Sequence, residues 1–525
     1  MAVNEDHINT SAHQEQLEGQ ASNNKRIAKN TLILYIRMVF LMAISLYTSR
    51  VVLMVLGVSD YGIYNAVGGV VAMFSVLSTS LATAVSRFLT FELGRGDIKK
   101  LKRVFATSVN VQILLAVSVS VIALIVGGWF LNVHMNIPEG RMKAANWVLV
   151  CSVLSFAVGL LSVPYNASII SHEKMSIFAY ISILEASLKL AIVFTIGYVS
   201  YDKLTTYAVL LLGAAIFIRL IYGIYCKRVF EECTYHFILD KSLLKEMTSF
   251  AGWNFLGNAA WMFNTQGINI LINLFFGVTL NAARGVAAQV ESAVMQFVNN
   301  FMLALNPQIT KSYAIGDLAN MHQLVCRGAR FSFFLVILFA IPICLETERI
   351  LSLWLNVVPD YAVIFVRLTF LSTLCTVLGN TLVTAQLATG DIKRYQIIIS
   401  LWGVWVFPLT WLAYKLGGSP IWAYVIYVFI YFVMVFIRIY LVKDLIKLSW
   451  KRYVSDVVVR CIVVSLIAAL PPAFAYFCLP ENFFRFIMVC LISLISSIIV
   501  IGLIGIDKSE RALMKQVLKR KLSYC

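Results

Sequence analysis

Apolar residues are grouped along this chain into long blocks that are separated by short polar connections. Each block runs for roughly 20 to 25 residues, the length that a helix needs to cross a hydrocarbon core of about 30 Å. Backbone groups inside lipid must be hydrogen-bonded within the chain, so blocks of this length are predicted to be helices. The pattern predicts an all-α polytopic membrane protein with about fourteen transmembrane helices. These spans are expected to begin near Asn30, Tyr61, Val104, Met142, Met175, Leu204, Thr248, Thr279, Gly328, Tyr361, Tyr395, Ile421, Val457 and Phe483.

The composition agrees with this pattern and leaves no segment long enough for a soluble enzyme. Of the 525 residues, 60% are hydrophobic and 13% are charged, and the mean hydropathy is +0.83. Soluble domains are nearer half apolar and a quarter charged. The ten cysteines are scattered and form no CxxC pair, so neither a metal site nor a disulfide framework is indicated. No cofactor, metal ligand set or catalytic constellation is expected.

Lys and Arg are distributed unevenly between alternate loops, and this asymmetry predicts the orientation. With the N-terminus inside, the cytoplasmic segments hold about 28 Lys and Arg residues and the opposite loops about 6. Both termini are therefore predicted to be cytoplasmic, in the inner membrane of a bacterium. The net charge of +17 is explained by these loop charges and by attraction to anionic lipid headgroups, so nucleic-acid binding is not indicated.

The chain also repeats itself at an offset of 220 residues. Leu56-Gly57-Val58-Ser59 matches Phe276-Gly277-Val278-Thr279, and Gly96-Asp97 matches Gly316-Asp317. A further match relates residues 167–173 to residues 385–391 at an offset of 218. Each unit holds six spans, an even number, so the copies are predicted to be parallel repeats, an arrangement used by alternating-access transporters.

The repeat predicts the domain organisation. We expect a disordered cytoplasmic tail at 1–29, an N-lobe at 30–226, and a cytoplasmic linker at 227–247 that could form an amphipathic surface helix. A C-lobe at 248–445, two additional spans at 446–506 and a basic tail at 507–525 complete the chain.

The segment from Ser49 to Tyr64, the helix end Ser86-Arg87-Phe88 and the following Gly94-Arg95-Gly96-Asp97 resemble the opening of polysaccharide-lipid flippases. These proteins belong to the multidrug/oligosaccharidyl-lipid/polysaccharide exporter superfamily. The resemblance implies two six-helix lobes around a V-shaped central cavity. It also implies that the two additional helices are similar to the pair that helps to form a lipid-tail groove in lipid II flippases.

Ionisable residues at membrane depth are costly and mark candidate sites. Arg37 lies on the first span on the face of Thr48, whereas Arg50 lies near the outer end of that span and is open to a snorkelling role. Arg87 lies near the cytoplasmic end of the second span, where a topogenic anchor is an equally good interpretation. Arg284 and Glu291 are seven residues apart on one face of the eighth span and suit a hydrated cavity wall.

Two further patterns carry candidate chemistry. Glu185 and Lys189 have the i, i+4 spacing of a helical ion pair, which favours a structural salt bridge and leaves ion coupling as the alternative. Asn254, Asn258 and Trp261 form a stripe on the seventh span that suits sugar hydroxyls and ring faces. Polar stripes also hold membrane helices together, so interhelical packing is at least as good an interpretation.

The resemblance implies a substrate class, an undecaprenyl-diphosphate-linked oligosaccharide moved from the cytoplasmic to the periplasmic leaflet. Guanidinium groups bind phosphate oxygens in a bidentate manner, so Arg37, Arg87 and Arg284 are expected to hold the diphosphate. Glu185, Lys189 and Glu291 are candidates for coupling to H⁺ or Na⁺. Membrane lipids, a polysaccharide polymerase and glycosyltransferases are the expected partners. The alternatives are a multidrug–cation antiporter of the same superfamily, a passive scramblase and, with least support, a membrane polymerase or ligase.

Overall fold

The structure is a computed structural model. It describes residues 26–45, 47–48, 51–52, 54–57, 60, 63–64, 67, 74–133, 137, 140–234, 240–355, 358–507 and 510–511. Arg50, the tail at 1–25 and most of the basic tail at 507–525 lie outside these ranges, as does much of the segment that carries the family resemblance.

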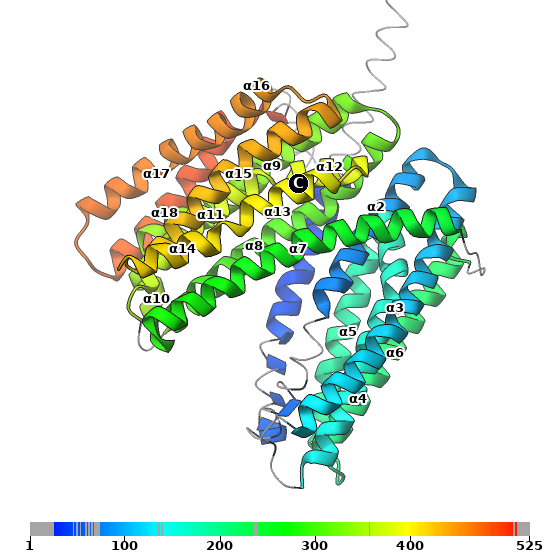
Figure 1. Ribbon diagram of the computed structural model, residues 1–525. Coiled ribbons are helices and arrows are strands. Elements are labelled where there is room, and N and C mark those ends of the chain that lie inside the picture. The colour runs from blue at the N-terminus through cyan, green and yellow to red at the C-terminus, as the bar shows by residue number, and fades with distance from the viewer. Residues whose placement is uncertain are drawn as a thin grey trace, which may run out of the picture. The chain divides into compact units, whose positions relative to one another are not determined.

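The described chain is built of helices (Figure 1). The first runs over Arg26–Ser45. It is followed by α2 Ser75–Arg95, α3 Ile98–Val133, α4 Met142–Ser171, α5 Met175–Ile196, α6 Lys203–Val229, the 3-10 turn η1 Glu231–Cys233, α7 Lys241–Phe276 and α8 Val278–Ala314. The remaining elements are α9 Leu318–Leu345, α10 Thr347–Trp354, α11 Ala362–Leu378, α12 Asn380–Thr389, α13 Lys393–Val404, α14 Val406–Lys415, α15 Trp422–Ile446, α16 Trp450–Tyr453, the π-helical turn η2 Val454–Val459, α17 Arg460–Cys478, α18 Phe483–Val500 and the π-helical turn η3 Ile501–Gly505.

Among the described residues, eleven helices are long and apolar enough to cross a membrane by length and composition. Three of these spans, Ala362–Thr389, Lys393–Lys415 and Trp450–Cys478, are each made of consecutive shorter elements. The long helices α2, α7 and α8 occupy the positions of the second, seventh and eighth predicted spans and are not among the eleven. The prediction of an all-α multi-pass membrane protein is confirmed.

The duplication is visible in the backbone as well as in the sequence. Gly57 and Gly277 both have positive φ angles, of 78° and 85°, and Gly96 and Gly316 have φ angles of 74° and 80°. Glycine adopts this left-handed conformation without the steric cost that a Cβ atom brings. The paired glycines end helices at equivalent points, so the 220-residue offset relates two copies of one backbone pattern.

The described residues form two compact units. The N unit comprises Leu32–Ala259 and Thr310–Gly316, and the C unit comprises Ala260–Ile309, Asp317–Cys525 and the residues before Leu32. In the N unit, α4 packs against α2, α3, α5 and α6, with Ala145 and Val148 fully buried in that core.

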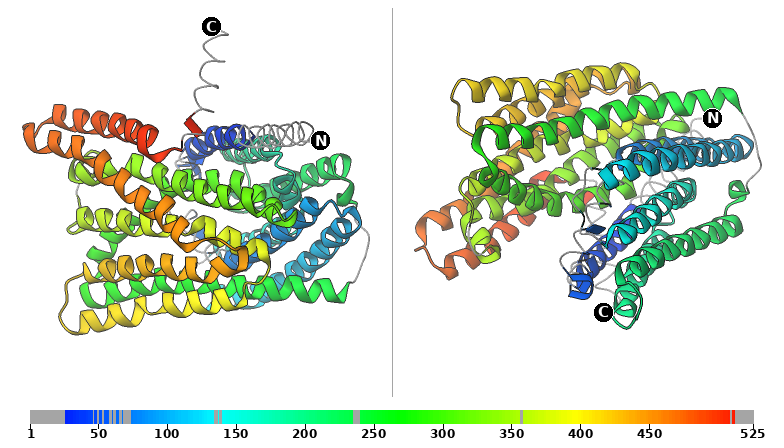
Figure 2. Two further views of the ribbon diagram at one scale, coloured as in Figure 1. Left: turned by 90° about the horizontal axis from the view of Figure 1, so that it is seen from above. Right: turned by 60° about the horizontal axis from the view of Figure 1, so that its bottom comes forward.

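In the C unit, α9 packs against α11, α12, α17 and α18. A second centre of packing is α15, which contacts each helix from α11 to α14. The two helices beyond the repeat, α17 and α18, lie side by side as an antiparallel pair (Figures 1 and 2). Arg485 at the start of α18 donates to the buried Glu346 at the end of α9 over 3.1 Å, which fixes one end of this pair to the repeat.

The connection between α6 and α7 contains η1, with Glu232 and Cys233 buried, and α7 has already begun at Lys241. In its described part, residues 227–234 and 240–247, the chain forms the end of α6, η1 and the start of α7, so a separate amphipathic surface helix is not present there.

Candidate functional site

Two polar recesses lie within the N unit. The first, of about 430 Å³, lies between α4, α5 and α6, and the second, of about 400 Å³, lies between the helix Arg26–Ser45, α5 and α6. Both are lined by Tyr64, Glu185 and Lys189, so they adjoin at the middle of α5. Ligand sites in proteins commonly have volumes of about 300 to 1,000 Å³ with a few polar groups. We therefore take these recesses together as the candidate functional site.

Lys189 and Glu185 form the ion pair that their spacing predicts. Lys189 Nζ donates to Glu185 Oε1 over 2.6 Å, and both side chains are partly exposed. A half-exposed pair of this kind contributes about 0.5 kcal/mol or less to stability. The pair places one charge of each sign in both recesses, whatever its further role.

Arg37 lines the second recess together with Thr48, on the shared face that the sequence predicts. Its guanidinium carbon lies 4.6 Å from the centre of the Phe178 ring, a cation–π contact that orients the group. Its Nε is buried and has no hydrogen-bond partner among the described residues. Burying an N–H donor without a hydrogen-bond acceptor costs free energy. Arg37 is therefore suited to binding an anionic ligand.

The first recess contains a feature that the sequence analysis overlooked. Ser152, Ser155, Gly159, Ser162 and Asn166 of α4 all line it. Their intervals of three and four residues place them on one face of the helix. Asn166 Oδ1 is buried and has no hydrogen-bond partner among the described residues. The spacing alone could have identified this stripe, but small serines in an apolar helix give a weak signal.

Arg87 lines neither of these two recesses. Its guanidinium carbon lies 4.7 Å from the ring centres of Phe88 and Phe91 and 5.7 Å from that of Phe250, on α7. The aromatic rings surround the cation and limit its access to a bulky ligand in this arrangement. A substrate contact by Arg87 remains a prediction. Phe88 and Phe91 are one and four residues away on the same helix, but the contact with Phe250 could not be inferred from sequence because it is more than 150 residues away.

Arg284 and Glu291 lie in the C unit, and each has its own partners. Arg284 Nη2 donates to the carbonyl oxygen of Thr265 over 2.9 Å, and its Nε donates to Asn269 Oδ1. Glu291 Oε1 accepts from the hydroxyl of Thr373 over 2.8 Å. The charges are thus held by neutral polar groups in a mainly buried network, and their predicted contact with substrate is untested.

The polar stripe of α7 has partners on α2. Asn258 Nδ2 donates to the Ser80 hydroxyl over 2.9 Å, and Asn254 Nδ2 lies 3.4 Å from the Ser80 carbonyl oxygen. These contacts agree with the packing interpretation of the stripe. Trp261 is 56% exposed and lies one turn beyond them. A role in binding sugar remains a prediction for all three.

Two other membrane arginines also have defined surroundings. Arg219 lies 3.9 Å from the centre of the Tyr165 ring. Arg367 donates to the carbonyl oxygen of Cys344 over 2.9 Å and so caps the end of α9. Both are consistent with structural roles.

The fold described above matches that of solved structures of MATE transporters. A multidrug-resistance MATE family transporter in an outward-facing conformation matches with a TM-score of 0.71, at 12% identity, over 81% of this chain and 96% of that one. MATE in a bent conformation gives the same values. A MOP superfamily transporter from Pyrococcus furiosus, described as having a binding pocket of reversed polarity that suggests a different function, matches with a TM-score of 0.66 and 11% identity over 80% of this chain and 96% of that one.

A similar sequence is the uncharacterized membrane protein EpsK of Bacillus subtilis (strain 168), which is 18% identical over 326 residues, or 61% of this chain. The matched region spans 63% of that protein's length. No family model matches the chain. At these identities the comparisons establish the fold and leave the substrate open.

Proposed function

We propose that this protein is a transporter that moves an undecaprenyl-diphosphate-linked oligosaccharide from the cytoplasmic to the periplasmic leaflet of a bacterial inner membrane by alternating access. The observation that carries the proposal is the position of Arg37, which lines a recess beside Lys189 and whose buried Nε has no hydrogen-bond partner among the described residues. Two cations in one partly enclosed polar space favour an anionic group. The predicted cytoplasmic location of both termini is part of the proposal.

Guanidinium and ammonium groups bind the oxygens of phosphate strongly because the hydrogen bonds are charge-assisted. A diphosphate reaching the second recess would accept from Arg37 and compete with Glu185 for Lys189. The lipid tail would stay in the bilayer, where it loses no hydrophobic stabilisation.

The first recess suits the glycan. Its α4 stripe offers serine hydroxyls and the Asn166 amide, and Tyr222 of α6 adds a phenol. These groups donate to and accept from sugar hydroxyls. Because the recesses adjoin at Glu185 and Lys189, one ligand could place its diphosphate and its first sugars in neighbouring spaces.

Coupling to H⁺ or Na⁺ requires a carboxylate whose charge state or ligation changes during transport. Glu185 lines both recesses, and Glu291 accepts a hydrogen bond from Thr373 in the C unit. We propose these two as the coupling candidates. Removing each carboxylate separately, and measuring the dependence of transport on H⁺ and Na⁺ gradients, tests them.

The second candidate function is export of lipophilic cations in exchange for ions. The neighbours described as multidrug transporters favour it, and Glu185 is the carboxylate in the recesses that could attract a cation. The two functions predict opposite effects of charge: Glu185→Gln should strengthen binding of a diphosphate and weaken binding of a cationic drug.

Binding to the purified protein in nanodiscs tests the proposal. We expect undecaprenyl diphosphate carrying a short oligosaccharide to bind the wild type, and Arg37→Ala to weaken binding by about tenfold, the effect of losing one charge-assisted contact. Arg228→Ala is the matched control, because Arg228 is an exposed arginine of the N unit that lines neither recess. Equal affinities in the two variants would contradict the assignment of Arg37.

A further inference from the structure

A third polar cavity, of about 360 Å³, lies in the C unit and shares no lining residue with the recesses described above. It lies between the first turns of α9, the segment Trp450–Val459 that leads into α17, and Asp507, which follows η3. We call it the guanidinium cavity. Its lining consists of His322, Gln323, Cys326, Arg327, Arg330, Arg452, Asp456 and Asp507.

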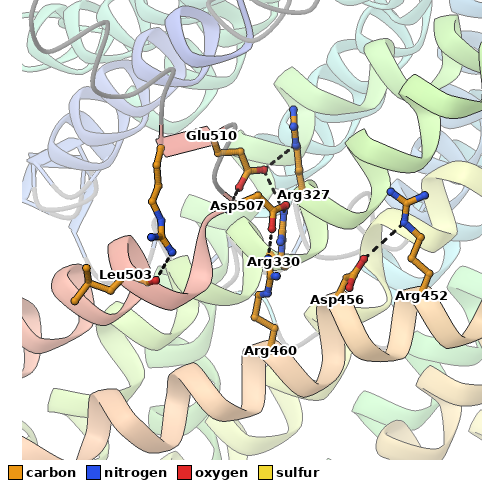
Figure 3. Close-up of polar contacts among 9 residues, drawn as sticks. Arg327, Arg330, Arg452, Asp456, Arg460, Leu503, Asp507 and Glu510 are labelled. Carbon is orange, nitrogen blue, oxygen red and sulfur yellow. Dashed lines mark hydrogen bonds and ion pairs between the residues drawn. The ribbon is translucent and has the colours of Figure 1, made fainter.

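Two carboxylates are held by three guanidinium groups at this cavity (Figure 3). Arg330 is only 3% exposed, and its Nη2 lies 2.8 Å from Asp507 Oδ2 and 3.1 Å from Glu510 Oε1. Arg327 Nε lies 2.7 Å from Glu510 Oε1, and Arg460 pairs with Asp507. The carboxylate oxygens of Asp507 and Glu510 thus occupy positions on these guanidinium groups to which the oxygens of another anion could also bind.

The backbone around the cavity is unusual on both sides. The π-helical turn η2 carries Asp456, and the π-helical turn η3 ends two residues before Asp507. Such turns are rare and are frequent at functional sites. Gly505 allows η3 to approach α9 closely, since a Cβ atom there would lie 2.8 Å from the Phe334 ring. Because of this close packing, Asp507 lies next to Arg330.

The charges at the cavity do not balance. Among the described residues, the ion pairs at and next to the cavity join four arginines, at 327, 330, 452 and 460, to three carboxylates, at 456, 507 and 510. The surplus positive charge is on the rim, because Arg452 is 59% exposed and pairs with Asp456 only at 3.6 Å. The cavity therefore has one guanidinium that is weakly held and available to a ligand.

Neutral polar groups lie beside these cations. Gln323 Oε1 is buried and has no hydrogen-bond partner among the described residues. His322 Nε2 is 2.7 Å from the carbonyl oxygen of Ile446, which leaves its other ring nitrogen for a further contact. Such groups can accept from ligand hydroxyls, so the cavity combines cations for a phosphate with acceptors for an alcohol.

We propose that the guanidinium cavity binds a phosphate ester that bears hydroxyl groups, with Arg452 and Arg327 contacting the phosphate and with their present partners, Asp456 and Glu510, competing for the same guanidinium groups. The chemistry is that of glycerol phosphate, which exists both as the headgroup of phosphatidylglycerol and as a soluble ester. A basic cavity between helices near the ends of membrane spans is a common setting for an anionic headgroup. This binding is independent of the proposed transport function.

The test uses the full-length protein in nanodiscs made of phosphatidylcholine. Phosphatidylglycerol is titrated in and counted on the protein by native mass spectrometry, and soluble glycerol phosphate is titrated separately by calorimetry. We expect saturable binding of at least one probe, weakened about tenfold by Arg452→Gln. Lys451→Gln, a neighbouring exposed lysine that does not line the cavity, should leave it unchanged. Binding of the lipid alone would identify a headgroup as the ligand, and binding of the soluble ester would identify a free phosphate.

Asp456→Asn distinguishes a binding site from a purely structural cluster. Because it removes a competing carboxylate, it should raise the affinity for the phosphate probe severalfold even if it lowers the melting temperature. The proposal is overturned if the wild type binds neither probe, if Arg452→Gln and Lys451→Gln bind equally, or if Asp456→Asn loses affinity together with stability.

Discussion

Lys189 donates to Glu185 over 2.6 Å at the point where two polar recesses of the N unit meet. Lys189→Gln, which removes the ammonium charge, should weaken binding of a polyprenyl diphosphate. Glu185→Gln should strengthen this binding, because Lys189 is then free to contact phosphate oxygens. The unfolding free energy should change by only about 0.5 kcal/mol in either case. Ligand titration and thermal unfolding of both variants check this. Lys203→Gln, at an exposed lysine outside the recesses, is the control, and equal effects of all three substitutions would contradict the assignment.

The α4 stripe provides a second prediction. Asn166→Leu and Ser155→Val remove polar groups from the first recess without changing its charge. We expect each to weaken binding of the oligosaccharide-bearing lipid severalfold and to leave binding of undecaprenyl diphosphate without sugars unchanged. If both ligands lose affinity equally, the stripe does not contact the glycan.

The hydrogen bond between Asn258 of α7 and Ser80 of α2 makes it possible to test whether Asn258 serves helix packing or substrate binding. A double-mutant cycle of Asn258→Ala and Ser80→Ala, measured by unfolding in nanodiscs, should give a coupling energy of about 0.6 kcal/mol, typical of hydrogen bonds between membrane helices. Ligand affinity should change little if the amide serves packing alone. A large loss of affinity without any coupling would instead favour the sugar-binding role predicted from the stripe.

The repeat glycines allow a matched test of backbone conformation. Gly316 has a φ angle of 80°, so Gly316→Ala should cost about 1 to 2 kcal/mol. Gly128, within α3, has open space around its Cβ position, and Gly128→Ala should be neutral or stabilising by up to about 1 kcal/mol. Thermal unfolding of the two variants measures the difference, and equal melting temperatures would contradict the conformational account.

The contacts of Asp202, which lies outside the membrane spans, predict that the stability of the protein depends on pH. Burial alone would raise the pKa of its carboxyl, but hydrogen bonds from Thr205 and from Arg141 outweigh this and lower the pKa below its ordinary value. The native state therefore binds fewer protons than the unfolded state does. The resulting stabilisation is present above the unfolded pKa of about 3.9, and it is lost as the pH falls through the folded pKa. Asp202→Asn should be less stable than the wild type at neutral pH, and the difference should shrink below about pH 4. A difference that is constant with pH would contradict this.

Much of the fold could be predicted from sequence because its signals are local. Apolar blocks of membrane length indicated the helices, and Gly57, Gly96, Gly277 and Gly316 marked equivalent helix ends. The three helices α2, α7 and α8 were also anticipated as spans although their hydropathy is lower than that of the other eleven.

The surroundings of individual charges could be predicted only where the partner was nearby in the chain. Lys189 and Glu185 are four residues apart, and their contact followed from helical spacing. The contact of Arg87 with Phe250 and that of Arg367 with the end of α9 join residues on different helices, which no periodicity reveals.

The measurement that tests the central proposal most directly is the transbilayer movement of a labelled polyprenyl-diphosphate oligosaccharide in proteoliposomes. We predict movement by the wild type and by Arg228→Ala, and its loss in both Arg37→Ala and Arg284→Ala when folding and insertion are intact. Absence of movement by the wild type, with and without H⁺ and Na⁺ gradients and with several glycans, would contradict the proposal, as would full activity of Arg37→Ala.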